Sequence, residues 1–268
     1  MGTVEKYYDD NTEAEWMRLE RHKIEFDITK RYLDEYVKTG TRVLDIGGGP
    51  GRYSLYLSLK GCHVHLLDLS SKNLEYAKNK ATELKIDIEK YFHADALHLS
   101  DKVNEQYDVI LCMGPIYHLP EEADRIKVMK NCIHHLKPGG ILIVSFISAY
   151  APIIDILKKY PEAIRGYKET LLSYLKDGRN IVSPENQGFT NAYFMNPNQM
   201  ASFMSQFDLV QKVLTGIEGI SAQSEEKINA LEETDYQEWI DLIYETSKDP
   251  LTWGACEHFL YIGQKKNT

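Results

Sequence analysis

A short apolar run followed at once by clustered glycines, at residues 43–51, places the strongest constraint on the fold. Its sequence is Val-Leu-Asp-Ile-Gly-Gly-Gly-Pro-Gly, and apolar residues at helical spacing follow from Tyr53 to Leu59. Glycine is needed where the backbone takes a positive φ or where a ligand approaches closer than a Cβ permits. A strand, a glycine turn and a helix in this order form the ligand-binding unit of a doubly wound α/β fold.

The spacing of the glycines narrows the class of ligand. A dinucleotide fingerprint requires G-x-G-x-x-G/A, but Arg52 or Ser54 stands at its last position, depending on which glycine begins the pattern. The chain instead has an acid followed by alternating glycines, namely Asp45, Gly47, Gly49 and Gly51. This pattern resembles motif I of the class I S-adenosylmethionine-dependent methyltransferases. The resemblance implies that Asp45 faces the ammonium of the cofactor and that loop amides face its carboxylate.

Acids end the next two predicted strands as well. Asp68 ends the run His63–Asp68, 17 residues past Gly51. An acid there binds ribose hydroxyls in NAD enzymes and methyltransferases alike, so it indicates a ribose without choosing the cofactor. Asp95 follows the short run Tyr91–His93, and the family resemblance implies that it lies beside the adenine amino group.

Two later segments extend the resemblance across residues 41–148. A fourth strand is predicted over 108–113, broken by Gly114-Pro115, and the run Leu136–Gly140 predicts a helix end and a turn before a fifth strand at 141–146. The resemblance therefore implies S-adenosylmethionine as cofactor. The residues that it assigns to cofactor binding are Asp45, Gly47, Gly49, Gly51, Asp68, Leu69, Asp95, Ala96 and Met113.

The expected architecture is α/β, with a doubly wound, mostly parallel seven-stranded sheet in one domain over residues 1–268. We predict an N-terminal helical segment over 1–40, in which Thr12 caps a helix with Glu15 three positions later. The other parts are a cofactor-binding core over 41–148, a helical cap over 149–190 and the C-terminal half of the sheet over 191–268. Within that half, the resemblance implies an antiparallel last strand at Phe259–Ile262 beside the fifth. Asn196-Pro197 is predicted to start a helix that runs to Phe207. Eight acids and one lysine between Glu225 and Glu245 indicate a helix with a solvated acidic face, and its apolar stripe is formed by Ile228, Leu231, Trp239, Leu242 and Ile243.

Composition bears on partners and compartment. The net charge is −9, whereas nucleic-acid binders usually carry a basic stripe, so a nucleic-acid partner is not expected. No apolar stretch approaches the roughly 18 to 20 residues that span a membrane. The four cysteines are scattered without C-x-x-C spacing, which is typical of the reducing cytoplasm.

Tyr117 and His118 are the candidates for contact with a methyl acceptor. They directly follow the fourth strand, at the carboxyl edge where open α/β sheets bind ligands. His118 is a candidate general base. The alternatives are that it caps a helix beginning near Pro120, or that it lines the pocket without taking part in chemistry.

A second candidate group precedes the core. Tyr7 and Tyr8 lie close before Arg18 and Arg21, whose spacing places both arginines on one helix face. They are candidates for closing over the cofactor and for binding an anionic acceptor, and ordinary amphipathic packing is the alternative. The other histidines show no metal-ligand spacing, so no required metal is predicted.

The leading functional hypothesis is methyl transfer to a small-molecule acceptor by in-line displacement. Methylation of tRNA or protein is one alternative, and a methyltransferase-like binding protein without turnover is another. The sequence leaves the acceptor and the oligomeric state open.

Overall fold

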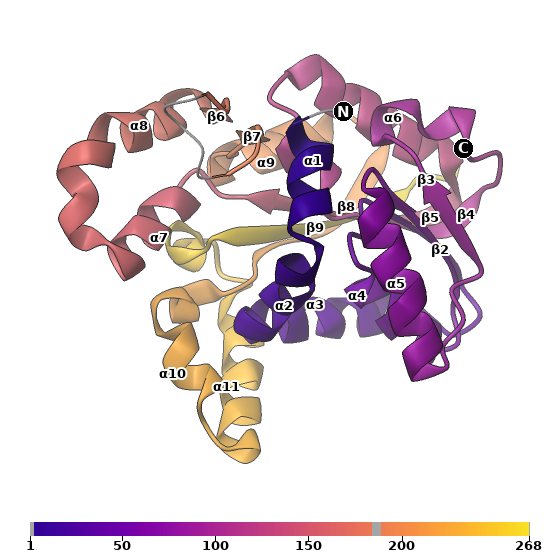
Figure 1. Cartoon of the computed structure of the whole chain (residues 1–268), viewed down its shortest axis with the longest axis horizontal. Helices are drawn as coiled ribbons and strands as arrows, with labels where there is room; N and C mark the ends of the chain where they lie inside the picture. Colours follow the sequence, from indigo (N-terminus) through magenta and orange to yellow (C-terminus); the bar gives the residue numbers. More distant parts are fainter. Residues whose placement is uncertain (1–2, 184–188, 268) are drawn as a thin grey trace.

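A seven-stranded sheet with the order β3-β2-β1-β4-β5-β9-β8 forms the centre of the molecule (Figure 1). The computed structural model describes residues 3–183 and 189–267. Strands β1 to β5 pair in parallel, and β9 runs antiparallel between β5 and β8, as predicted for the last strand. The strands are β1 (Arg42–Ile46), β2 (His63–Asp68), β3 (Lys90–His93), β4 (Tyr107–Cys112), β5 (Leu136–Ile147), β8 (Leu209–Gly216) and β9 (His258–Lys265).

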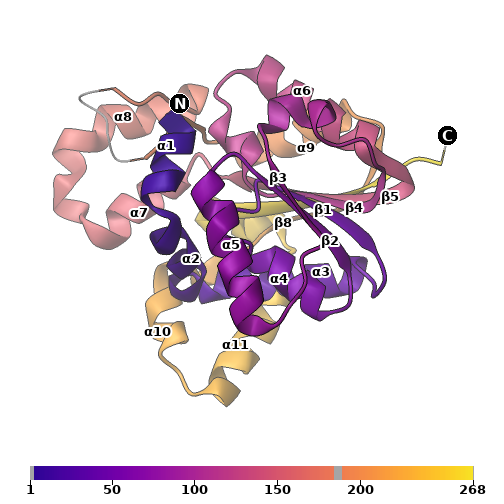
Figure 2. The same cartoon turned by 45° about the vertical axis from the view of Figure 1, so that its right-hand side comes forward.

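Helices cover both faces of this sheet, which gives the predicted doubly wound α/β architecture (Figure 2). One core joins the sheet to α3 (Lys23–Tyr36), α4 (Arg52–Leu59), α5 (Ser71–Leu84), α10 (Glu225–Asn229) and α11 (Glu233–Thr246). The other joins it to α6 (Glu122–His135), α9 (Pro197–Ser205) and the 3₁₀ turn η1 (Ala96–Asp101). Residues of β1 alternate between the two cores, since Val43 packs into the first and Leu44 into the second.

The N-terminal segment consists of three helices, α1 (Thr3–Asp10), α2 (Thr12–Arg21) and α3. The predicted cap at Thr12 is wrong by one position, because Asn11 precedes the first turn of α2 and makes no side-chain cap hydrogen bond. The Thr12 hydroxyl instead donates to the Tyr8 carbonyl oxygen at 2.9 Å. Thr12 therefore stabilises the junction between α1 and α2.

The start of β5 also differs from the prediction. The strand begins at Leu136, and the expected turn at Leu136–Gly140 is an irregular part of it. Tyr107 pairs with Leu136 but Val109 pairs with Ile141, so β5 carries extra residues opposite β4. Gly139, at φ +73°, takes the left-handed conformation that this detour requires.

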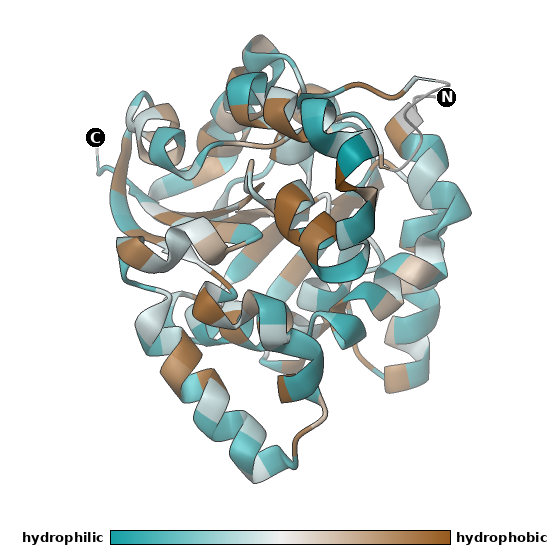
Figure 3. Ribbon diagram, turned by 90° about the vertical axis from the view of Figure 1, so that its left-hand side faces the viewer, coloured by the Kyte–Doolittle hydropathy of each residue, from teal (hydrophilic) through white to brown (hydrophobic). Residues whose placement is uncertain are grey.

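The predicted cap consists of α7 (Ala151–Lys159), η3 (Pro161–Ala163) and α8 (Ile164–Asp177), set to one side of the sheet (Figure 1). A small ribbon of β6 (Arg179–Asn180) and β7 (Ala192–Tyr193) follows. Positions 184–188 of the expected cap lie outside the described residues. Figure 3 faces this side of the molecule, where apolar and polar residues alternate along the helices. Apolar side chains on both cap helices, including Leu157 and Tyr167, remain exposed.

The acidic C-terminal segment forms two helices, α10 and α11, rather than one. Tyr236, Ile240 and Ile243 are the buried residues of α11, whereas Trp239 and Leu242 of the expected apolar stripe are exposed. The buried face is therefore offset from the predicted one. The remaining turns are η2 (Pro115–His118), η4 (Gly219–Ser224) and η5 (Pro250–Ala255). Among the described residues, none of the helices has the length and apolar character needed to cross a membrane.

Candidate active site

A cavity of about 300 Å³ lies at the carboxyl ends of β1, β2, β3 and β4. This is the edge at which parallel α/β sheets bind ligands. Residues of α1 and α2 form its opposite wall, among them Tyr8, Glu15 and Arg18. Helices that precede the sheet in the sequence therefore cover the ends of its strands.

Two glycines of the loop after β1, Gly47 and Gly49, line the cavity. Each position requires glycine for a different reason. Gly47 has φ +68°, and a Cβ on it would lie 2.7 Å from the Pro115 ring. Gly49 has φ +58°, but no atom lies closer than 3.9 Å to its Cβ position. Gly47 is thus required by packing and backbone conformation, whereas Gly49 leaves open space for a ligand.

The backbone amides of this loop are already hydrogen-bonded. Those of Gly47 and Gly48 donate to the Leu67 carbonyl oxygen at 2.7 and 3.3 Å. The amide of Gly49 donates to Asp68 Oδ2 at 2.8 Å. In this conformation these amides are therefore occupied by acceptors of the protein itself, and the positive charge at the cavity comes from arginine side chains.

Three buried or half-buried acids approach the cavity from successive strands. Asp45 accepts a hydrogen bond from Ser54 Oγ at 2.7 Å, and burial together with nearby Asp68 raises the pKa of Asp45 to about 7. Asp68 Oδ1 accepts from the Ser70 amide at 2.8 Å, and burial raises the pKa of Asp68. Asp95 accepts from the Leu97 amide at 2.8 Å and begins η1. Strand ends and local turns thus fix all three carboxylates.

The side chain of Asn73 adds a polar atom to the same wall. Its Nδ2 donates to Asp68 Oδ1 at 3.2 Å, while its buried Oδ1 has no partner among the described residues. Asn73 lines the cavity. An unpaired buried acceptor is costly unless a ligand completes it, so this atom is a candidate for ligand contact.

His118 lies buried at the end of η2, held between α1 and the segment that follows the cap helices α7 and α8. Tyr8 Oη lies 2.7 Å from its Nε2, and Thr190 Oγ1 lies 2.8 Å from its Nδ1. Because the Thr190 hydroxyl donates to the Asn191 carbonyl oxygen, Nδ1 of His118 carries the ring hydrogen and Nε2 accepts from Tyr8. Burial lowers the pKa of His118 to about 4, so the ring is neutral at physiological pH. It does not cap α6, whose N-cap is Glu121.

Arg18 brings positive charge to the cavity and is tied to two carboxylates. It donates to Glu15 at 3.0 Å and to Glu25 at 2.6 Å. Burial alone would raise the pKa of Glu25, but Arg18 and His258 hold it at about 2. Arg52 lines the neighbouring wall, where its guanidinium lies 4.7 Å from the Trp16 ring and bonds Glu20 at 2.5 Å.

Most residues predicted for the site meet at this cavity. Its lining includes Asp45, Gly47, Gly49, Asp68, Leu69, Asp95, Ala96, Met113, Tyr117, His118, Tyr8 and Arg18. Gly51, Tyr7 and Arg21 are not among the lining residues. Gly51 is the N-cap of α4, and Tyr7 packs edge-on against Tyr8 and Phe189. The Arg21 side chain reaches back to the Ala14 carbonyl oxygen.

Sequence reasoning did not assign Glu15, Asn73 or Thr190 to the site. Only Glu15 carried a sequence indication, since its spacing of three from Arg18 permits an ion pair on one helix face. Asn73 and Thr190 reach the site through tertiary contacts.

Comparison with known proteins agrees with this geometry. Residues 43–140 match the family model described as a methyltransferase domain. A ubiquinone biosynthesis O-methyltransferase from a Shewanella species is 30% identical over 178 residues, which cover 66% of this chain and 67% of that protein. The chain belongs to the class I S-adenosylmethionine-dependent methyltransferases. It is accordingly an enzyme, and its cofactor is S-adenosylmethionine.

One further relative and one solved structure are also similar to this chain. A ubiquinone biosynthesis O-methyltransferase from Marinobacter nauticus is 29% identical over 188 residues, covering 69% of this methyltransferase and 71% of that one. The crystal structure of an S-adenosylmethionine-dependent methyltransferase from Clostridium acetobutylicum has a TM-score of 0.61 at 14% identity. Its match covers 96% of this chain and 98% of that one. At this identity the second similarity concerns the fold alone.

Proposed function

We propose that this methyltransferase acts on a small-molecule acceptor within the cavity bounded by α1, α2 and η2. The lining supports this proposal, because the carboxyl-edge acids and the glycine loop form one wall and Tyr8, Tyr117 and His118 form another. Its size, about 300 Å³, fits small ligands better than a polynucleotide. The names of the similar proteins, O-methyltransferases of ubiquinone biosynthesis, support the same class of acceptor.

The residues of the first wall fit S-adenosylmethionine. We assign Asp45 to its ammonium, Asp68 to the ribose hydroxyls and Asp95 to the adenine amino group, with Leu69, Ala96 and Met113 around the adenine. The open space at Gly49 and the unpartnered Asn73 Oδ1 support this assignment. Arg18 and Arg52 are the candidates for the carboxylate, since the loop amides bond within the protein.

The cofactor supplies an activated methyl group on a sulfonium. The protein must align the acceptor with that methyl group and exclude water, and such alignment lowers the barrier by several kcal/mol. Tyr117 is held for this task, because its hydroxyl donates to the Met113 carbonyl oxygen at 2.9 Å. We assign Tyr117 and His118 to the acceptor side of the cavity.

The state of His118 supports a positioning role over a general-base role. Its pKa of about 4 makes it a weak base at neutral pH. Its Nε2 instead accepts the hydroxyl hydrogen of Tyr8, so this nitrogen is not free to take a proton from the methyl acceptor. An acceptor that is already nucleophilic, such as a phenolate, a thiolate or a carboxylate, fits this wall.

The observation that carries the proposal is the convergence of Asp45, Asp68 and Asp95 on one cavity. A thermal-shift titration tests it, with S-adenosylmethionine and S-adenosylhomocysteine as ligands and NADH as control. We expect saturable stabilisation by the first two alone. Asp68→Ala should weaken binding by about 1.5 to 3 kcal/mol, the range for a charged hydrogen-bond partner. Unchanged affinity in Asp68→Ala would place the cofactor elsewhere.

The acceptor class requires its own assay. A panel of small phenols, thiols and carboxylates, with labelled S-adenosylmethionine, should include at least one substrate, and tRNA serves as the contrasting substrate. Methylation of tRNA alone would contradict the proposal. We also propose the reducing cytoplasm as the compartment, which the four buried free thiols support.

A further inference from the structure

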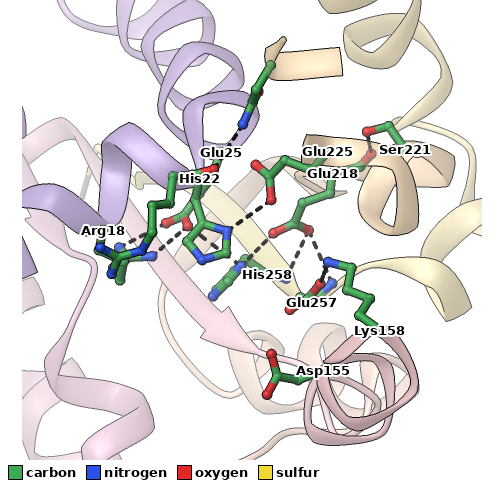
Figure 4. A network of polar contacts seen from close by, with 12 residues as sticks. Arg18, His22, Glu25, Asp155, Lys158, Glu218, Ser221, Glu225, Glu257 and His258 are labelled. Carbon is green, nitrogen blue, oxygen red and sulfur yellow. Dashed lines mark hydrogen bonds and ion pairs between the residues drawn. The ribbon is translucent and has the colours of Figure 1, made fainter. Parts of the chain in front are cut away.

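A cluster of alternating charges extends from Arg18 at the cavity wall towards the sheet (Figure 4). Arg18 donates to both oxygens of Glu25, at 2.6 Å from Nη1 and 3.2 Å from Nη2. The same Glu25 Oε2 lies 3.7 Å from Nδ1 of His258. That ring nitrogen donates its hydrogen to Glu218 Oε1. Two cations and two carboxylates therefore alternate along this cluster.

The end of the cluster remote from the cavity is fixed by backbone contacts. Glu218 is 2% exposed, and its Oε2 accepts from the amides of Glu257 and His258 at 3.1 Å each. His258 is the first residue of β9 and pairs with Ile147 of β5. Arg18, by contrast, belongs to α2, outside the sheet. The cluster therefore ties a side chain of the cavity wall to the central sheet.

His258 carries a positive charge that the cluster requires. Burial alone would lower the pKa of His258, but Glu25 and Glu218 raise it to about 9, so the ring is a cation at neutral pH. Without this charge, Arg18 would face two buried carboxylates. Because an uncompensated buried carboxylate is costly, Glu25 and Arg18 would then rearrange. The imidazolium thus keeps both side chains where the structure places them.

Two neighbouring basic side chains pair with other carboxylates. Lys158 of α7 pairs with Glu257. Nδ1 of His22 lies 3.0 Å from Glu225 Oε2, and the centroid of its ring lies 6.4 Å from that of His258. His258 is therefore the basic group that contacts Glu218 and Glu25 together.

The partners of Arg18 determine which of its donors can reach a ligand. A guanidinium has five N–H groups. Glu25 takes one from each terminal nitrogen, and Glu15 takes the one on Nε at 3.0 Å. Five minus these three leaves two N–H groups, one on each terminal nitrogen. Since Arg18 lines the cavity, fixing the guanidinium on two sides orients this remaining pair.

We propose that His258 is a positioning residue for the cofactor carboxylate, because its imidazolium holds Glu25 and Glu25 holds Arg18. The inference rests on the proposed assignment of Arg18 to that carboxylate. His258 and Glu25 are not among the lining residues of the cavity, so they act through Arg18 and not by touching the ligand. They therefore affect binding of the amino-acid end of the cofactor and leave binding of its adenosine end unchanged.

Two ligands that differ in the carboxylate test this proposal. S-adenosylhomocysteine has both an ammonium and a carboxylate, whereas its decarboxylated analogue keeps the ammonium and the adenosine. Calorimetry at neutral pH measures both affinities for the parent, for His258→Asn, which keeps a donor without the charge, and for Glu25→Gln. Each variant should bind S-adenosylhomocysteine about tenfold more weakly, the loss for a weakened hydrogen bond between charged groups. Affinity for the decarboxylated analogue should remain parental, because that ligand makes no bond to Arg18.

His63→Asn is the matched control. His63 also contacts a carboxylate through Nδ1, that of Glu89, but at the exposed first position of β2. It should bind both ligands like the parent. Parental affinity for the decarboxylated analogue verifies that a variant folds, and Glu25→Gln decides the test if His258→Asn does not fold.

Two results overturn the proposal. Equal losses for both ligands in Glu25→Gln and His258→Asn would show a general structural role, and parental affinity of both variants for S-adenosylhomocysteine would show no role in binding. A parent that binds the two ligands equally well would contradict the assignment of Arg18 to the carboxylate, and with it this inference. The proposed contacts of Asp45 and Asp68 with the cofactor are tested separately and would stand.

Discussion

At the scale of single residues, burial changes the protonation of Asp45, the carboxyl that we propose binds the cofactor ammonium. Without the cofactor, burial and the neighbouring Asp68 raise the pKa of Asp45 to about 7. An ammonium group beside the carboxylate favours the charged form and lowers this pKa. The proposed contact of Asp45 with the cofactor ammonium would therefore link ligand binding to proton release from Asp45.

This linkage predicts a pH-dependent affinity for S-adenosylhomocysteine. Affinity should be full well above pH 7 and should fall as the pH drops below the free-state pKa, because Asp45 must then lose a proton to bind. The limiting slope is about tenfold per pH unit, so binding should be roughly tenfold weaker at pH 6 than at pH 8. Calorimetry across that range measures it, and Asp45→Asn should remove the slope. A parental slope in Asp45→Asn would assign the linkage to another group.

The second prediction at the residue scale concerns the protonation of His118. Its hydrogen bonds to Tyr8 and Thr190 specify a neutral ring with hydrogen on Nδ1. Imidazole ¹⁵N shifts should show this tautomer, with no protonation until the pH approaches 4. Since histidine in the unfolded chain binds its proton near pH 6.5, this residue should reduce stability as the pH falls from that value towards 4. Titration of His118 near 6.5, or hydrogen on Nε2, would contradict the network.

Sequence could predict Asp45, Asp68 and Asp95 because their positions depend on local strand ends, which recur in order along the chain. It could not predict Asn73 or Thr190, since neither position is fixed by local pattern. Thr190 lies at the end of the predicted cap segment and meets His118 across 72 positions of sequence. The Glu25, Glu218 and His258 cluster was missed for the same reason, because its members come from three distant segments.

At the scale of elements, the β1–α4 loop contains two glycines with different roles. Gly47 and Gly49 both have positive φ, so alanine at either position costs about 1 kcal/mol or more in backbone strain. Only at Gly47 would an added Cβ also clash with a neighbour, the Pro115 ring. The two positions therefore differ in what a methyl group would meet.

Alanine substitutions should separate stability from binding. Gly47→Ala should lower the melting temperature more than Gly49→Ala, because its Cβ would lie 2.7 Å from Pro115. Gly49→Ala should retain the fold but weaken S-adenosylhomocysteine binding at least tenfold, about 1.4 kcal/mol, because its methyl group enters the cavity. Melting curves and calorimetry on both variants provide the comparison. Equal affinity of Gly49→Ala and the parent would mean that the ligand does not approach this loop.

Elements with strong local patterns were predicted well, and those shaped by tertiary pairing were not. Asn196 caps α9 through its side chain, as the Asn-Pro pair indicates. The start of β5 was placed too late, because pairing of Leu136 with Tyr107 extends the strand through a Pro-Gly-Gly segment that locally reads as a turn. The apolar stripe of α11 was misassigned because its buried face depends on α3 and α10.

Across the whole molecule, the N-terminal helices join the two sides of the cavity. In α1, Asp9 accepts from Ser70 Oγ at 2.6 Å, beside the β2 edge, while Tyr8 bonds His118 near the β4 edge. Asp9 is the buried residue of this helix, and its other described positions are at least partly exposed. α1 is therefore attached mainly by polar contacts, whereas α3 packs in the core with Ile24 and Ile28.

This difference predicts that α1 controls ligand exchange more than it stabilises the fold. Removing α1 (Thr3–Asp10) deletes little apolar burial, so the melting temperature of the free protein should fall by only a few degrees, about 1 kcal/mol. Dissociation of S-adenosylhomocysteine should become at least tenfold faster, because Val4 and Tyr8 no longer cover the cavity. Stopped-flow displacement measures the rate, and Tyr8→Phe, which removes only the bond to His118, should give a smaller acceleration. Collapse of the fold on deletion would show instead that α1 belongs to the core, and an unchanged dissociation rate would show that the ligand leaves by another face.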